Sequence, residues 1–188
     1  WKRQTGTTLK LDLGEAILAP LTADFSHVRT LELKAVAWSD TADTFLGRFP
    51  NLEKLSVTHS TLDKLPPDVA PMSVLKALEL SSNRIEFNEQ TAAKLGALKQ
   101  LEHLDLSGNP LGTVPDFRGM SHLQSLNLSN TGLDHWPNGL RDQVALDVVD
   151  LRNNQLREIP QGILAPSNEE RLAITRINSV TLIEGNPF

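Results

Sequence analysis

One short pattern recurs along the whole chain and restricts the fold more than any other feature. Its full form is Leu-x-x-Leu-x-Leu-x-x-Asn-x-Leu, with other aliphatic residues allowed at the leucine positions. Full copies begin at Leu75, Leu101 and Leu146, copies with Ser60 or Thr131 in place of asparagine begin at Leu52 and Leu123, and weaker copies begin at Thr8, Val28 and Asn178. Successive asparagine-type positions lie 20 to 32 residues apart. The pattern therefore predicts eight coils of one repeated structural unit.

Each copy predicts a short strand followed by a turn. The leucines of Leu-x-Leu point to one side of a strand, and the residues between them point to the other side. One coil cannot bury its leucines alone, but stacked coils bury them in a continuous column. The pattern resembles leucine-rich repeats, whose usual period is about 20–29 residues. This resemblance predicts an α/β leucine-rich-repeat solenoid, curved like a horseshoe, with a parallel concave sheet of about eight short strands.

The asparagine of each copy is expected to stabilise the turn that follows the strand. Its amide carries two donors and an acceptor, enough to pair with buried backbone groups of its own coil and the neighbouring coil. Ser60 and Thr131 supply part of this bonding, whereas Ala16 and Val36 supply none. The first two coils should therefore be less regular than the rest.

The outer side of the solenoid should be mostly extended or 3-10 structure, because a proline ends four of the outer segments and prevents a helix from passing through. Two short helices are expected as exceptions. The first follows an Asn88 cap and runs to Leu98. The second opens at the capping box 167–170 and runs to about Ile177, with Leu172, Ala173 and Ile177 as its buried stripe.

The repeats predict a single domain over residues 1–188. It divides into irregular N-terminal coils (1–50), regular repeats (51–166), and a helical insertion with the last strand (167–188). The segment Asn186–Phe188 matches the middle of an earlier coil, so we expect the chain to be a fragment of a larger protein. As an isolated domain it should be a monomer.

Composition excludes several classes of function. The net charge of −5 disfavours nucleic acid as the main partner, because such proteins usually present a basic surface. No run approaches the roughly 18 apolar residues of a membrane span. The chain has no cysteine, which excludes disulfides and thiolate chemistry here and favours an intracellular or bacterial origin. No phosphate loop or dinucleotide motif occurs, and we expect no cofactor.

The C-terminal third carries a narrower resemblance. The segments 151–160, 168–172 and 184–188 look like repeat regions of bacterial effectors that place such repeats before a novel-type E3 ubiquitin ligase (NEL) domain. In that family the catalytic residue is a cysteine of the ligase domain, so no catalytic residue carries over to this chain. The resemblance implies a substrate-recognition or autoregulatory segment, without enzyme activity of its own, of a bacterial protein that is secreted into a host cell. The alternative is a structural or self-associating module of a large bacterial protein.

The concave face is the expected site for a protein partner. Its middle row should run through Asp12, Glu32, Ser56, Glu79, Asp105, Asn127, Asp150 and Leu182. The candidate partner-binding residues are Glu32, Lys54, Ser56, Glu79, His103, Asp105, Asn127, Asp150 and Arg152. The strands of Glu79, Asp105 and Asn127 carry acids and no base, which predicts an acidic patch for a basic partner. The alternative is that these residues only solvate the strands.

Catalysis by His103, Asp105 and Ser107 is disfavoured by strand geometry. Residues on the same face of a strand lie about 6.6 Å apart along it, beyond the hydrogen-bond distance that a catalytic triad needs. A metal site would rest on one histidine, so no metal is expected either.

Overall fold

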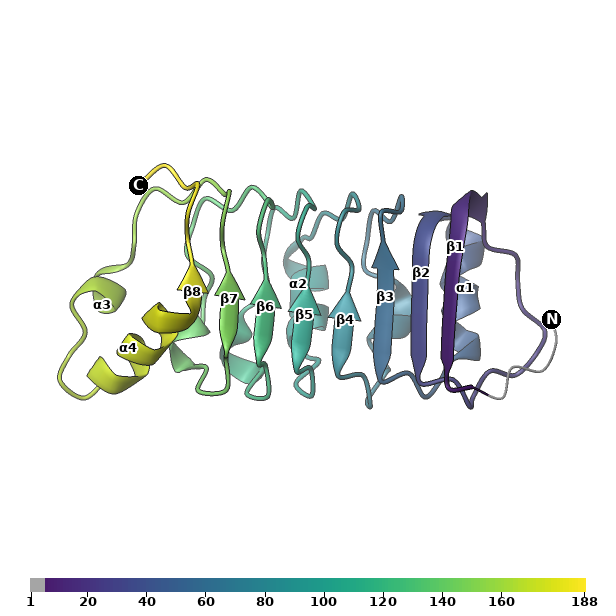
Figure 1. The fold of residues 1–188 in the computed structure, drawn as a ribbon, viewed down its shortest axis with the longest axis horizontal. Coiled ribbons are helices and arrows are strands. Elements are labelled where there is room, and N and C mark those ends of the chain that lie inside the picture. The colour runs from purple at the N-terminus through teal and green to yellow at the C-terminus, as the bar shows by residue number, and fades with distance from the viewer. Residues whose placement is uncertain (1–5) are drawn as a thin grey trace.

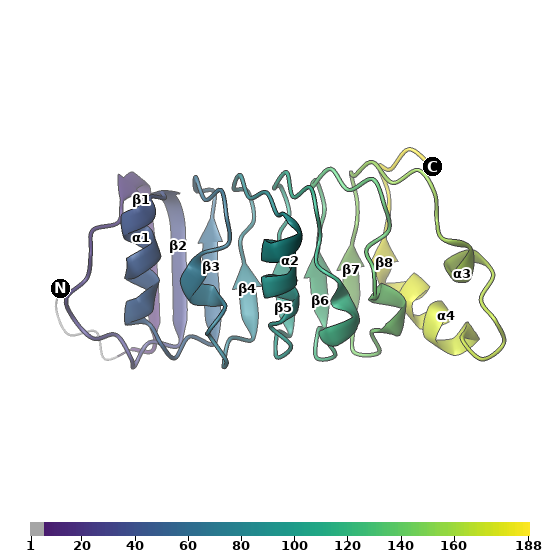
Figure 2. The same ribbon diagram turned by 180° about the vertical axis from the view of Figure 1, so that it is seen from behind.

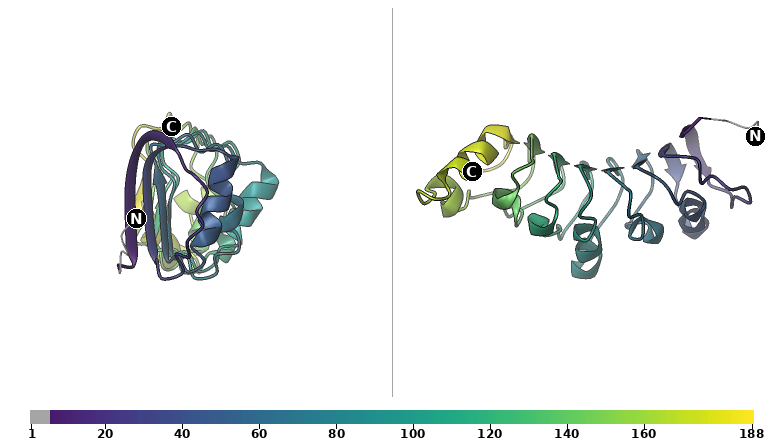
Figure 3. Two further views of the ribbon diagram at one scale, coloured as in Figure 1. Left: turned by 90° about the vertical axis from the view of Figure 1, so that its right-hand side faces the viewer. Right: turned by 90° about the horizontal axis from the view of Figure 1, so that it is seen from below.

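The computed structural model describes residues 6–188, apart from the side chains of Asp40, Thr41 and Asp43. Its main feature is one sheet of eight parallel strands that lie side by side in chain order (Figure 1). The strands are β1 (Thr8–Ile17), β2 (Thr30–Ala37), β3 (Lys54–Thr58), β4 (Ala77–Glu79), β5 (His103–Asp105), β6 (Ser125–Asn127), β7 (Val148–Asp150) and β8 (Thr181–Leu182). The sheet forms the concave side of a curved solenoid, and most of the helices lie behind it (Figures 2 and 3). The predicted solenoid is confirmed.

The core is the column of aliphatic side chains predicted from the repeats. Strand pairing aligns one such residue from each of the strands β1 to β7: Leu9, Leu31, Leu55, Leu78, Leu104, Leu126 and Val149. From β2 onward these side chains are at most 1% exposed. Burying a side chain of this size contributes about 1.5–3 kcal/mol, so the stacked coils stabilise one another.

The asparagine ladder is also present as predicted. The Asn109 amide donates to Leu80 O of the preceding coil at 2.8 Å and to Leu106 O of its own coil at 2.9 Å, while its Oδ1 accepts from Ile85 N at 3.0 Å. Ser60 and Thr131 make fewer of these bonds: the Ser60 hydroxyl accepts from Val36 N, and the Thr131 hydroxyl donates to Leu128 O. Both substitutes therefore keep part of the ladder.

The first strand corrects the predicted position of Asp12. In the structure Lys10, not Asp12, pairs with Glu32, and Asp12 pairs with Lys34. The two strands then shift register between Asp12 and Ala16, where Gly14 and Glu15 both adopt positive φ. Asp12 therefore lies outside the middle row. The bulge contains extra residues of β1, so the residues before it pair two positions further along β2 than the repeat pattern predicted.

The structure contains both predicted helices and further short ones. The predicted pair are α2 (Glu89–Gly96), capped by Asn88 and lying behind the sheet, and α4 (Arg171–Val180), which lies at the C-terminal end of the solenoid and not on its outer side (Figures 2 and 3). The other elements are α1 (Asp40–Phe45), η1 (Leu46–Arg48), η2 (Pro67–Val69), η3 (Phe117–Gly119), η4 (Leu140–Asp142) and α3 (Gln161–Leu164). Helix α1 packs Phe45 against Phe49 at a ring distance of 5.2 Å, and both rings are buried.

The buried stripe of α4 differs from the prediction. Ser167 and Glu170 form the expected contact, but the helix begins at Arg171. Ile174 and Ile177 are buried, whereas Leu172 is 87% exposed. Ala173 is also exposed. The predicted stripe was therefore wrong at two of its three positions, because the later helix start turns a different face to the core.

Candidate functional site

The nine predicted binding residues lie on or directly beside the concave face of β2 to β7. Strand pairing places six of them in one row across the sheet: Glu32, Ser56, Glu79, Asp105, Asn127 and Asp150. Lys54 and His103 lie in the adjacent row, and Arg152 follows the end of β7. Leu182 continues the middle row on β8. The fold thus brings residues from six coils onto one surface.

The N-terminal half of this surface is balanced by ion pairs. Lys10 lies 2.7 Å from Glu32, and Lys54 lies 2.7 Å from Glu79 and 4.0 Å from Glu32. Lys34 and Asp12 add a pair at 3.5 Å. The strand of Glu79 itself carries no base, as the sequence indicated, but Lys54 of the neighbouring strand neutralises its carboxylate. Of the neighbouring acids Glu79 and Asp105, Glu79 is therefore already paired within the molecule.

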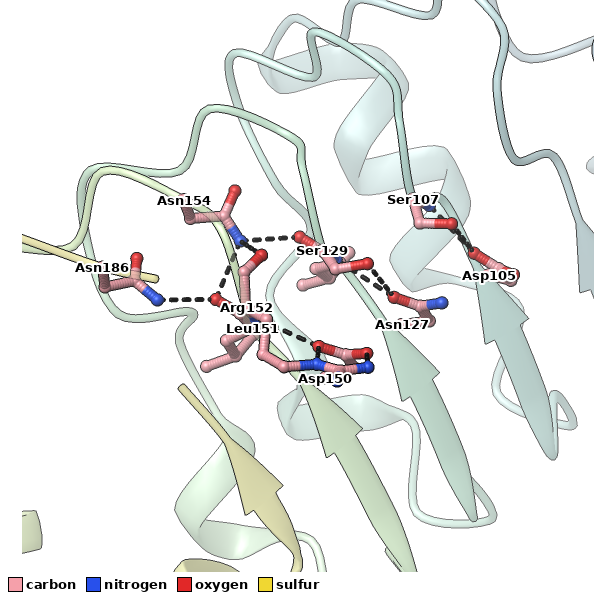
Figure 4. A network of polar contacts seen from close by, with 10 residues as sticks. Asp105, Ser107, Asn127, Ser129, Asp150, Leu151, Arg152, Asn154 and Asn186 are labelled. Carbon is pink, nitrogen blue, oxygen red and sulfur yellow. Dashed lines mark hydrogen bonds and ion pairs between the residues drawn. The ribbon is translucent and has the colours of Figure 1, made fainter. Parts of the chain in front are cut away.

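The middle-row side chains of β5, β6 and β7 have a structural role that the sequence analysis did not assign. Asp105 Oδ1 accepts from the backbone nitrogen and the hydroxyl of Ser107, at 2.9 and 2.7 Å. Asn127 Oδ1 accepts from the same two groups of Ser129, at 3.1 and 2.8 Å (Figure 4). Each side chain thus caps the backbone two residues later, just before a left-handed residue turns the chain out of the strand.

Asp150 combines this cap with an ion pair. Its Oδ1 accepts from Arg152 N at 3.0 Å, and the Arg152 guanidinium binds both carboxylate oxygens at 3.0 and 2.6 Å (Figure 4). Hydrogen bonds from the Arg152 side chain and backbone hold the pKa of the Asp150 carboxyl below its usual value, although partial burial opposes them. Both charges are therefore satisfied within the coil.

Two polar atoms at the centre of the surface have no hydrogen-bond partner among the described residues. They are the second carboxylate oxygen of Asp105 and the amide nitrogen of Asn127, each on a half-buried side chain. The two residues are direct neighbours across β5 and β6. An acceptor and a donor therefore stand next to each other, facing solvent.

Sequence reasoning missed the apolar end of the surface. Val148 on β7 and Leu182 on β8 are 38% and 36% exposed on the concave side. Both occupy positions of the repeat that normally carry polar residues, and this was the signal that could have identified them. Together with the free atoms of Asp105 and Asn127, they distinguish the C-terminal half of the face from the ion-paired half.

The geometry also bears on the two alternatives considered from the sequence, a catalytic triad and a metal site. The Ser107 hydroxyl donates to Asp105, and no hydrogen bond joins it to His103 in the described part of the chain. Within residues 6–188, no group of three or more histidine, aspartate or glutamate side chains is placed to hold a metal ion. In the same range, no helix is both long and apolar enough to cross a bilayer.

Comparison with known families supports the repeat assignment. The family model described as "Leucine rich repeat" matches residues 50–111 and 73–133. The monocyte differentiation antigen CD14 of Rattus norvegicus is 31% identical over 93% of this chain, which spans 54% of the rat protein. The chain thus covers about half of that relative's length.

Two solved structures share the fold at lower sequence identity. A leucine-rich-repeat protein of Leptospira interrogans superposes with a TM-score of 0.65 at 18% identity, covering 86% of this chain and 44% of that one. The Arabidopsis receptor kinase HAESA, solved in complex with a peptide hormone and a co-receptor, gives a TM-score of 0.66 at 21% identity. That match covers 94% of this chain and 29% of the receptor.

Proposed function

We propose that a protein partner docks on the concave face of β5 to β8, because the chain is a leucine-rich-repeat domain and such domains are typically modules for protein–protein interaction. The observation that carries this proposal is the asymmetry of the face. In the N-terminal half, Lys10, Lys34 and Lys54 are already paired with acids of neighbouring strands. In the C-terminal half, Asp105 and Asn127 keep free polar atoms, and Val148 and Leu182 expose apolar surface.

Charge favours a basic partner. On the concave face, the charged residues of β5 to β8 and of the positions that directly follow these strands are Asp105, Asp150, Arg152 and Glu184, three acids against one base. Asp150 is neutralised by Arg152, which leaves Asp105 as the central acid without an ion pair in the described part of the molecule. Such a charge steers a basic segment toward the face, and salt weakens the effect over about 10 Å at 0.1 M.

Site-specific photo-crosslinking in the parent protein tests the docking surface. A crosslinker at Ser125, half-buried at the centre of the concave face, should capture the partner. The control position is Glu89, which is exposed at the start of α2 on the convex side. A crosslinker at Glu89 should not capture the partner. Capture from Glu89 alone would place the partner on the outer face and refute the proposal. Crosslinks to another segment of the parent chain would favour the self-associating alternative.

The finer proposal concerns what this binding serves. The resemblance of segments 151–160, 168–172 and 184–188 to NEL effectors leads us to propose that the face recruits a substrate for ubiquitin transfer by a separate domain. Because the chain has no cysteine, the segment should form no thioester with ubiquitin. The test is transfer by the parent protein: Asp105→Lys should lower modification of the crosslinked partner, while Glu89→Lys should not. Equal modification by both variants would show that binding at this face does not serve ubiquitin transfer.

A further inference from the structure

We infer that the occupant of this face is an extended polypeptide segment with a basic side chain and an apolar side chain four positions apart. The segment would cross strands β5 to β8 with the basic side chain at Asp105 and the apolar side chain at Leu182. This inference rests on the proposed function and specifies the class of partner. Three features of the face support it: two free polar atoms, a distance along the row, and the fixed positions of the side chains.

The first feature is a pair of free atoms that matches a peptide group. The free oxygen of Asp105 accepts hydrogen bonds, and the free Asn127 nitrogen donates them. In Figure 4 the Asn127 nitrogen lies on the side of its strand that faces β5. Adjacent strands are about 4.8 Å apart. A peptide backbone that crosses them presents both N–H and C=O groups, so one segment can offer a partner to each atom.

The second feature is the distance from the acid to the apolar surface. Strand pairing places Asp105, Asn127, Asp150 and Leu182 in one row, so Asp105 and Leu182 are three strand spacings apart. Three spacings of about 4.8 Å give roughly 14 Å. Four residues of extended chain at about 3.4 Å each give nearly the same length, and residues i and i+4 point to the same side. A spacing of three would turn one of the two side chains away from the face.

The third feature is that intramolecular bonds hold the side chains of this row in place before any segment binds. The cap on Ser107 fixes Asp105, the cap on Ser129 fixes Asn127, and Arg152 fixes Asp150. These side chains lose little freedom on binding, which favours affinity. Because Asp150 is already paired with Arg152, the position between Asn127 and Leu182 offers no free charge. Within this row of the described residues, a basic side chain therefore has one unpaired acid to bind, Asp105, and the direction along the row is set by Leu182.

Selection from a random dodecapeptide library displayed on phage tests this inference. The bait is the domain of residues 1–188, and a second selection uses the double variant Asp105→Asn with Asn127→Asp. This exchange keeps both Oδ1 caps and the net charge, but it moves the acid one strand closer to Leu182. Peptides selected on the native face should show lysine or arginine four positions from an aliphatic or aromatic residue, in one chain direction. They should bind the exchanged variant and Leu182→Ser at least tenfold more weakly, and Glu89→Lys unchanged.

The possible outcomes separate the two proposals. Peptides that lose binding on the concave variants but show no preferred spacing would overturn the extended four-residue footprint and leave concave docking intact. Peptides that bind all variants equally, or a failure to enrich any peptide, would count against both. A preferred spacing that stays at four on the exchanged variant would show that Asp105 does not bind the basic side chain, and this would also overturn the inference.

Discussion

Replacing Asn109 by alanine should destabilise the domain by an amount that follows from the bonds it makes. Asn109 is 1% exposed. Its loss removes the acceptor of Ile85 N and the donor to Leu106 O, whereas Leu80 O keeps a bond from Asn83 at 2.9 Å. The buried Ile85 N and Leu106 O are thus left without their hydrogen bonds to Asn109. At about 1–3 kcal/mol for each unsatisfied group, with partial relaxation, we expect a loss of about 2–4 kcal/mol in the free energy of unfolding.

Two companion variants sharpen this test. Asn186→Ala removes equivalent bonds, to Leu156 N and Ile183 O, but at a half-buried position where water replaces them, so the loss should stay below about 1 kcal/mol. Asn109→Thr copies Thr131, whose hydroxyl donates to the carbonyl of its own strand, and should recover about half of the loss. Urea midpoints and hydrogen exchange at the Ile85 amide measure these effects. Equal midpoint shifts for the two alanine variants, or unchanged protection of Ile85, would refute the ladder argument.

Other variants test other parts of the structure. Asp150 has a lowered pKa in the folded state, so its contribution to stability is fully present above the unfolded pKa of about 3.9 and is lost as the pH falls from there through the lower folded pKa. The difference in urea unfolding between Asp150→Asn and the native chain at pH 7 should therefore shrink as the pH is lowered through this range. Gly139 has φ of 85°, and an added Cβ would overlap the backbone of Arg118, so Gly139→Ala should lower the melting temperature by several degrees. Glu79→Gln removes the half-buried ion pair with Lys54 but leaves a group that can still accept a hydrogen bond, so it should change the unfolding free energy by less than about 1 kcal/mol.

The scaffold was largely predictable because its determinants are periodic. The leucine column, the asparagine ladder and the helix behind Asn88 each repeat or follow a local rule. The register of the first strand was not predictable, because Leu9, Leu11 and Leu13 allow two registers and only the pairing with β2 selects one. Helix α1 also escaped prediction, because the stretch 40–45 has no clear apolar periodicity. It packs through Phe45 on Phe49, which in turn stacks on Phe25 from an earlier part of the chain.

The candidate site was predictable as a surface but not as a set of interactions. Alternation in the strands placed Glu79 and Asp105 on the concave face correctly. It gave no means to know that Lys54 would reach across to Glu79, because that contact depends on side-chain conformations over two coils. The caps were within reach of sequence reasoning: Asp-Leu-Ser at 105–107 and Asn-Leu-Ser at 127–129 both place an acceptor two residues before a serine.

Asp105 and Asn127 serve both the scaffold and the proposed binding surface, through different atoms of the same side chain. Asp105 and Asn127 each use one oxygen to hold the turn, and their other atom faces solvent. Aspartate and asparagine are equivalent in the first role, because both supply the same acceptor, and opposite in the second, because one accepts and the other donates. An exchange between them should therefore change the hydrogen bonds that the face offers while preserving the strand end. Because the binding atoms vary at constant fold, each coil can alter its contribution to recognition without loss of the leucine column that stacks it on its neighbours.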